Sequence, residues 1–144
     1  MSYSSLQKSR LPITILRISI GIIYLWFGML KFFPHVSPAE DLAKETIQLL
    51  TFGLIPPNLS IILLAGWETT IGLLLVSGFF GRVAMPLVVT HMVLTFTPLF
   101  LLPHLSFTHL PYALTLVGQY IIKNIVIICA LLAISTYQRR EVVQ

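Results

Sequence analysis

Five ionisable side chains stand inside stretches of sequence that are otherwise apolar, namely Arg17, Lys31, Glu68, His91 and Lys123. A charged side chain near the centre of a bilayer costs at least about 2.5–3.5 kcal/mol, so each needs a partner, a water path or a route to the surface. Glu68, His91 and Lys123 each fall near the midpoint of a separate stretch, so we expect them at one depth. Ionisable groups in that position are typical of ligand sites and proton relays.

An ion pair between Glu68 and Lys123 is the simplest way to neutralise two of these charges. It would leave Arg17 and Lys31 as unpaired cations, and a net positive interior favours an anionic or acceptor-rich ligand such as a quinone, a quinol or a small acid. Plainer interpretations stay open. The pair could serve only to fix helix register, Lys31 could snorkel to the headgroups, and His91 could bond a backbone carbonyl.

The first apolar stretch carries its polar and small residues on one helical face. Arg17, Gly21, Tyr24, Gly28 and Lys31 are four, three, four and three positions apart, so we expect them to line the bundle interior. The gaps left by glycines can seat a neighbouring helix or a flat ligand. A matching stripe is predicted in the last stretch, through Gln119, Lys123, Val126, Ala130 and Ala133.

Aromatic and amide groups complete the predicted site. Tyr24 and Asn124 join the midplane layer, and Tyr24 and Trp67 would flank the ring of a ligand, although packing or an interfacial aromatic belt would also account for the aromatic residues. The predicted ligand-binding residues are Arg17, Tyr24, Lys31, Trp67, Glu68, His91, Lys123 and Asn124. No catalytic residue and no metal ligand is assigned.

The composition predicts the scaffold that must position these groups. Of the 144 residues, 56% are hydrophobic and only 10% are charged, and the mean hydropathy is +0.91, which excludes an ordinary soluble domain. Four stretches reach the roughly 20 residues that a helix needs to cross a bilayer: 11–33, 59–80, 83–102 and 112–136. Because lipid offers no partner to bare backbone, we expect an all-α fold, an integral membrane four-helix bundle forming a single transmembrane domain over residues 1–144.

A short amphipathic helix is predicted over residues 38–50, in the first connection. Ser37 would be its N-cap, Pro38 would take the first helical position, and Glu40 would return a carboxylate in a capping box. This helix would lie on the membrane surface as a linker, or cover a bundle cavity as a lid.

Pro98 predicts a kink in the third span, because proline removes one helical hydrogen bond. Thr95 and Thr97 could then satisfy the freed carbonyls.

The basic residues predict how the chain is oriented. Five basic residues lie at the termini or in the second connection: Lys8, Arg10, Arg82, Arg139 and Arg140. The first and third connections together contain one, Lys44. The positive-inside rule then places both termini in the cytoplasm. We expect a multi-pass protein of the bacterial inner (plasma) membrane.

Several kinds of chemistry find no support in the sequence. Cys129 is the single cysteine, which excludes a disulfide within the chain. Only His91 lies inside a span, so a bis-histidine haem is not expected, and His104 and His109 lack the helical spacing of a metal pair. There is no phosphate-binding loop, hydrolase signature or nucleic-acid-binding stripe, and no intrinsic cofactor is expected.

Three segments carry a family resemblance: LRISIGIIYLWFGMLKFFP, LLAGWETTIGLLLVSGFFGR and GQYIIKNIVIICALL. They resemble the DoxX-like family of small four-helix bacterial membrane proteins, and its YkgB-type branch in particular. That family includes the small subunit of a thiosulfate:quinone oxidoreductase and members linked to oxidative-stress resistance. The resemblance implies an inner-membrane bundle acting beside a redox partner, and it singles out Arg17, Gly28, Lys31, Glu68, Gly72 and Lys123.

Three functions follow as hypotheses. The leading one is a quinone-facing or redox-associated membrane subunit, in which Lys123 or His91 donates to a quinone carbonyl and Glu68 handles a proton. The second is a small-solute or proton transporter, which would need a homo-oligomer because four spans are few for alternating access. The third is a non-catalytic assembly or stress-response partner. Catalysis by this chain alone is not expected.

Overall fold

The computed structural model describes residues 3–79 and 83–142 and consists mainly of long helices. In chain order the elements are α1 (Tyr3–Leu30), α2 (Glu40–Leu50), α3 (Pro57–Ser77), α4 (Ala84–Phe96), α5 (Pro98–Leu101), α6 (Pro103–Ser106), β1 (Phe107–His109), β2 (Ala113–Leu114) and α7 (Leu116–Val142). The helical stretches long and apolar enough to cross a membrane are Arg10–Leu30, Pro57–Ser77, Ala84–Leu101 and Leu116–Gln138. The expected all-α bundle of membrane-spanning helices is therefore confirmed, and the chain is a multi-pass membrane protein.

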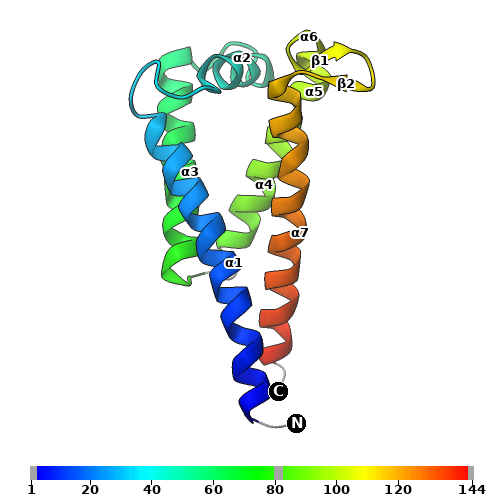
Figure 1. The fold of residues 1–144 in the computed structure, drawn as a ribbon. Coiled ribbons are helices and arrows are strands. Elements are labelled where there is room, and N and C mark those ends of the chain that lie inside the picture. Colours follow the sequence, from blue (N-terminus) through cyan, green and yellow to red (C-terminus); the bar gives the residue numbers. More distant parts are fainter. Residues whose placement is uncertain (1–2, 80–82, 143–144) are drawn as a thin grey trace.

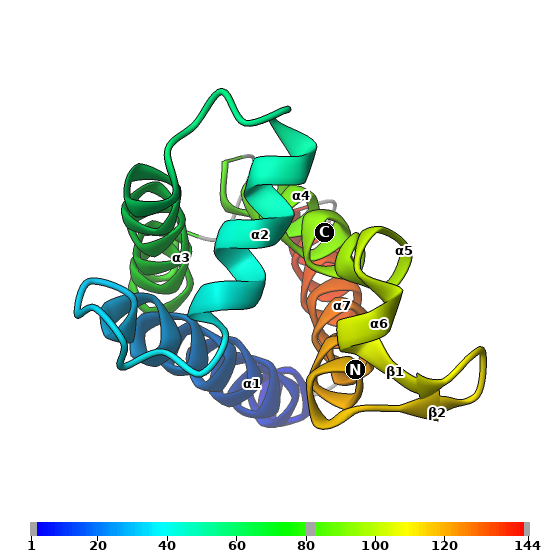
Figure 2. The same ribbon diagram turned by 90° about the horizontal axis from the view of Figure 1, so that it is seen from above.

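The small elements gather at one end of the bundle. In Figure 1 the helix α2, the short helices α5 and α6 and the β1–β2 hairpin lie at one end, while α1 begins and α7 ends at the other. We call these the α2 end and the termini end. Seen from the α2 end, α2 lies across the middle of the ring formed by the four spanning helices (Figure 2). The predicted amphipathic helix thus covers one end of the bundle.

Large apolar side chains cover the outside of the spanning helices. Trp26 of α1 is 67% exposed, Leu73 of α3 58% and Val126 of α7 70%. Such side chains would be unfavourable in water but are well accommodated by hydrocarbon. Membrane lipid is therefore a partner of this surface.

The closest helix pair is α1 with α3, and glycines allow its approach. A Cβ atom on Gly28 of α1 would lie 2.9 Å from the backbone nitrogen of Thr69, and one on Gly72 of α3 would lie 2.9 Å from the carbonyl oxygen of Gly21. Two backbones come this close only where side chains are absent. Both glycines of α1 are buried, so the predicted stripe on the first span does face the bundle.

The predicted stripe on the last span is wrong. Lys123 and Val126 are exposed, whereas the buried face of α7 carries Ile121, Leu131 and Ile134. Gly118 permits this packing, because a Cβ atom there would overlap the carbonyl oxygen of Ser106. The prediction followed polar residues, but in α7 tight packing of small and apolar side chains decides which face turns inward.

The kink at Pro98 is confirmed, since α4 ends at Phe96 and α5 begins at the proline. The missing Pro98 N–H would have bonded the carbonyl oxygen of Leu94, which instead accepts the Thr97 hydroxyl at 2.7 Å and the Thr97 backbone N–H at 3.1 Å. The hydroxyl of Thr95 similarly donates to His91 O at 2.7 Å. Thr97 therefore acts as predicted, whereas Thr95 bonds a carbonyl that Pro98 does not free.

The predicted capping box of α2 is wrong. The helix begins at Glu40, its N-cap is Ala39, and no side chain caps it. The Glu40 carboxylate instead accepts a hydrogen bond from the Lys44 ammonium at 2.6 Å and one from the backbone N–H of His35 at 2.7 Å. The ammonium, and to a smaller extent the N–H, hold the pKa of this carboxyl below its ordinary value. Glu40 therefore ties α2 to the preceding turn, where His35 has a positive φ of 63°.

The fourth span begins later than predicted. The chain before α7 forms an antiparallel hairpin in which Phe107 pairs with Leu114 and His109 with Ala113. Tyr112, the predicted start of the span, lies in the turn of this hairpin. Alternation of apolar and polar residues over so few positions is too short a signal to predict strands.

Candidate functional site

A chain of hydrogen bonds joins α1, α3 and α4 inside the bundle. The ammonium of Lys31 donates to Oε2 of Glu68 at 2.6 Å, and Oε1 of Glu68 lies 3.1 Å from Nε2 of His91. On the other side of the imidazole, Nδ1 lies 3.1 Å from the hydroxyl of Tyr24. We call Tyr24, His91, Glu68 and Lys31 the buried network.

All members of the buried network are withdrawn from the surface, with exposed fractions of 4% for Tyr24, 7% for Lys31 and Glu68, and 8% for His91. Lys31 and Glu68 form a close ion pair, and every further contact within the network is a hydrogen bond. Each charge therefore has the partner that burial demands.

Two features of the helices bring the buried network together. Tyr24 and Lys31 are seven residues apart, so they lie on one face of α1, and Gly28 between them lets α3 approach. Glu68 lies eleven residues after Pro57, about 16 Å along α3 from the α2 end of that helix. The network therefore sits well inside the bundle, and the depth predicted for Glu68, His91 and Tyr24 is consistent with their contacts.

The predicted Glu68–Lys123 pair is wrong. Lys31 takes the place of Lys123, which lies on the exposed face of α7 with its ammonium 5.2 Å from the ring centre of Tyr120. The span predicted over residues 11–33 puts Lys31 nine residues past its midpoint, which left it without a partner in the predicted layer. In the structure Glu68 packs against Gly28, one turn before Lys31, and the lysine stem reaches back over that turn to the carboxylate.

The predicted surplus of two interior cations is wrong as well. Lys31 is neutralised by Glu68, and the Arg17 guanidinium donates to the carbonyl oxygen of Leu75 near the end of α3. It also packs against Gly78, the left-handed residue that ends this helix. Arg17 therefore closes a helix C-terminus, where a cation is favoured by the helix dipole.

The partners of His91 define how protons are held. A carboxylate only accepts hydrogen bonds, so Nε2 of His91 must donate to Glu68. In the neutral imidazole Nδ1 is then the acceptor, and the Tyr24 hydroxyl donates to it. The network thus runs in one direction, from the phenol through the imidazole to the carboxylate. His91 does not bond a backbone carbonyl through its side chain, which was the plainer expectation.

Trp67 adds a polar atom with no partner. Its Nε1 is buried and finds no acceptor within the part of the chain that the structure describes, and the same holds for the hydroxyl of Thr69. The Trp67 ring lies 6.0 Å from the His91 ring at an interplanar angle of 70°. Leaving a buried donor unsatisfied costs about 1–3 kcal/mol, so such an atom calls for an explanation.

The remaining predicted residue, Asn124, is half-buried on α7 and contributes no hydrogen bond to the buried network among the described residues. Thr69 was not predicted, because a threonine inside an apolar span is ordinarily satisfied by its own helix. Only the structure shows that Thr69 belongs to this region, because its hydroxyl packs directly against Gly28 of α1.

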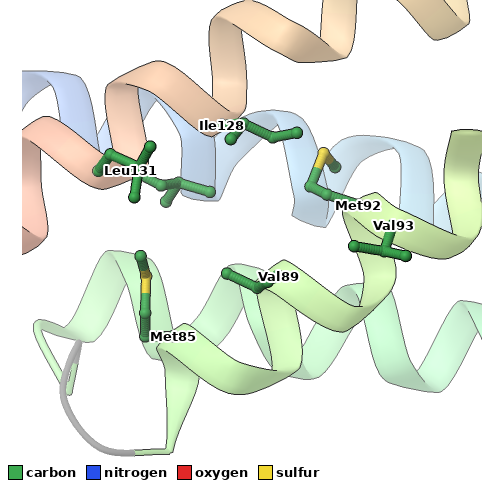
Figure 3. Close-up of a pocket in the computed structure, with 7 residues that line it drawn as sticks. Met85, Val89, Met92, Val93, Ile128 and Leu131 are labelled. Carbon is green, nitrogen blue, oxygen red and sulfur yellow. The ribbon is translucent and has the colours of Figure 1, made fainter.

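An apolar pocket of about 120 Å³ lies between α4 and α7. Met85, Val89 and Met92 line it from α4, and Ile128 and Leu131 face them from α7 (Figure 3). Met92 directly follows His91 in the sequence, so the pocket runs close to the depth of the buried network. Its lining suits a hydrocarbon chain and offers nothing to a polar group.

Comparison with known proteins gives one match. The DoxX family model matches residues 13–102, which span α1 to α5 and include every member of the buried network. No curated protein and no solved structure matches the chain. The match covers more than half of the sequence, and the chain belongs to the DoxX family.

Proposed function

We propose that this protein is a redox-associated membrane subunit whose buried network binds the headgroup of a quinone. The observation that carries the proposal is the Trp67 Nε1 donor, buried without an acceptor beside His91. A quinone carbonyl is a hydrogen-bond acceptor on a flat ring, and it would offset the cost of that donor. The rings of Trp67 and Tyr24 both lie edge-on to the His91 ring, so aromatic groups surround the place where a flat headgroup would bind.

The network supplies the proton chemistry that such a ligand needs. Reduction of a quinone to a quinol takes up two electrons and two protons, and oxidation releases them. In the proposed site a quinol hydroxyl passes a proton to the Tyr24 oxygen while the Tyr24 proton moves to Nδ1 of His91 and the Nε2 proton moves to Glu68, and quinone reduction runs this relay in reverse for one of its two protons. Lys31 keeps the carboxylate charged between turnovers. The electrons would come from a redox partner protein in the bacterial inner membrane.

The pocket between α4 and α7 would hold the tail of the same ligand. It is wholly apolar and adjoins the network through Met92. Methionine side chains adapt their shape readily, so Met85 and Met92 suit a chain that must slide in from lipid. Headgroup and tail would thus have separate sites of matching polarity.

Quinone binding by the protein in lipid nanodiscs tests this proposal. The variant Trp67→Phe keeps an aromatic ring, although a smaller one, and loses the N–H, so we expect affinity for a short-chain benzoquinone to fall about tenfold, the equivalent of 1.4 kcal/mol. Glu68→Gln should lower it further by disrupting the network. Trp26→Phe is the matched control, because Trp26 faces lipid. Lys123→Met should also leave binding unchanged.

The readout is quenching of the remaining tryptophan fluorescence during titration, combined with quantification of quinone extracted from the purified protein. Equal affinity in wild type and Trp67→Phe would remove the main support for the site. Binding that is lost in Lys123→Met but kept in Glu68→Gln would place the ligand elsewhere.

A further inference from the structure

The buried network is sealed on one side only. Towards the termini end, each helix continues with apolar residues: Ile20 one turn from Tyr24, Ile71 and Leu75 one and two turns from Glu68, and Val88 one turn from His91. Each of these is at most 4% exposed. Together with Ala84, Leu131 and Ile134 they form one continuous core cluster, which includes Tyr24 and Met92. The apolar side chains of this cluster offer water no hydrogen-bond partner, and the pocket that Met92 and Leu131 line is apolar as well.

The α2 end is built differently. The buried polar side chains outside the network, counted over the described residues, all lie on this side: Ser37, Glu40, Thr46, Ser60 and Ser106. The buried apolar residues there, such as Ile61, Ala65 and Ile121, do not belong to the continuous core cluster. Lys31, the end member of the network, follows directly on the last residue of α1 at this end. Polar groups and the absence of a continuous apolar core favour access by water from this side.

We propose that the buried network exchanges protons and small polar solutes only with the compartment at the α2 end. Protons taken up or released at Glu68 and His91 then come from one side of the membrane, and the chain conducts nothing across it. The apolar cluster is the barrier, and the route passes Ser60 and Ala65 on α3 beneath α2. This inference goes beyond quinone binding, because it concerns the sides of the membrane and holds for any ligand of the network.

Cysteine accessibility tests the proposal, and the chain is well suited to it. Replacing Cys129 by Ser removes the single cysteine. Ala65→Cys and Ile71→Cys are a matched pair on α3, because both residues are 0% exposed and lie three positions before and after Glu68. Asp41→Cys on α2 and Phe79→Cys in the connection after α3 are exposed and report the two sides.

The probe is silver ion, which is about as small as water and binds thiols. It is applied in chloride-free buffer to sealed membrane vesicles of both orientations. Maleimide labelling after denaturation measures the thiol that silver left free. We expect Ala65→Cys to be blocked in the same vesicles as Asp41→Cys, and Ile71→Cys to be protected in both orientations.

Blocking of Ile71→Cys in either orientation would overturn the proposal. Blocking of Ala65→Cys in the vesicles in which Phe79→Cys is blocked would also overturn it. So would protection of Ala65→Cys in both orientations. Ser60→Cys replaces an oxygen by a sulfur at a position that is 1% exposed. It provides a second probe on the α2 side of the network if Ala65→Cys does not fold. None of these outcomes depends on whether a quinone binds.

Discussion

Replacing Gly72 by alanine should force α1 and α3 apart. A Cβ atom at this position would lie 2.7 Å from Cγ of Leu25, 2.8 Å from the Leu25 backbone nitrogen and 2.9 Å from the carbonyl oxygen of Gly21. A leucine side chain could turn away, but two of the three atoms belong to the backbone of α1. The helix as a whole must therefore move, and the contacts on either side of Gly72 must loosen.

The expected cost follows from this geometry. Overpacking of a well-packed interface costs about 1–3 kcal/mol. Gly66 is the matched control, because it lies in the same helix and a Cβ atom there meets nothing within 4 Å. Gly66→Ala should stabilise the helix by up to about 0.5–1 kcal/mol. The same gain applies at Gly72, so the two variants should differ by the overpacking cost, roughly 1–3 kcal/mol in free energy of unfolding.

Unfolding in mixed micelles, followed by circular dichroism as denaturing detergent is added, measures this difference. Gly72→Ala should unfold at a lower detergent fraction than wild type, and Gly66→Ala at the same or a higher fraction. If both variants unfold together, the close approach of α1 and α3 at Gly72 does not exist in the membrane protein.

Three further predictions concern single contacts. Thr97→Val should destabilise the fold by about 1 kcal/mol in the same unfolding assay, because the Leu94 carbonyl loses the shorter of its two hydrogen bonds and keeps only the one from the backbone N–H of residue 97; in the Pro98→Ala background the loss should be smaller, and an equal loss would argue against this role. Because the folded pKa of Glu40 lies below its ordinary value of 4.5, its stabilisation is present above that pH and is lost as the pH falls through the folded pKa. Glu40→Gln should therefore be less stable than wild type at pH 7 and should converge with it in acid, and a constant difference across this range would contradict the role of its charge. Lys31→Met should lower stability by roughly 3–5 kcal/mol, because it leaves the Glu68 carboxylate buried without its cation, and adding Glu68→Gln should restore much of the loss. Purely additive effects of these two changes would show that the residues do not interact.

The sequence predicted the spans and the depth of the site because those features depend on local patterns. Lengths of apolar sequence located all four crossing helices, and the glycine stripe of α1 was visible as alternating intervals of four and three. The kink at Pro98 and its repair by Thr97 follow from the chemistry of two neighbouring residues.

The pairing of charges could not be predicted, because it depends on how the helices pack and rotate. Lys123 was the expected partner of Glu68, since both lie near the midpoints of their predicted spans and Lys31 lies towards the end of its own. The close packing of α1 on α3 at Gly28, which sets Glu68 one turn from Lys31, and the rotation of α7, which leaves Lys123 on its exposed face, decide the pairing instead. Neither is a property of the charged residues themselves.

Nitrogen NMR of His91 in lipid bilayers, during titration with a short-chain benzoquinone, tests the central claim most directly. The other histidines lie at the α2 end, and His91→Gln identifies the signals. We predict that Nδ1 and Nε2 of His91 shift on adding the quinone, that Tyr24→Phe and Glu68→Gln change their starting positions, and that Lys123→Met does not. The account would be contradicted if the His91 signals did not shift on adding the quinone, and if they changed in Lys123→Met but not in Glu68→Gln.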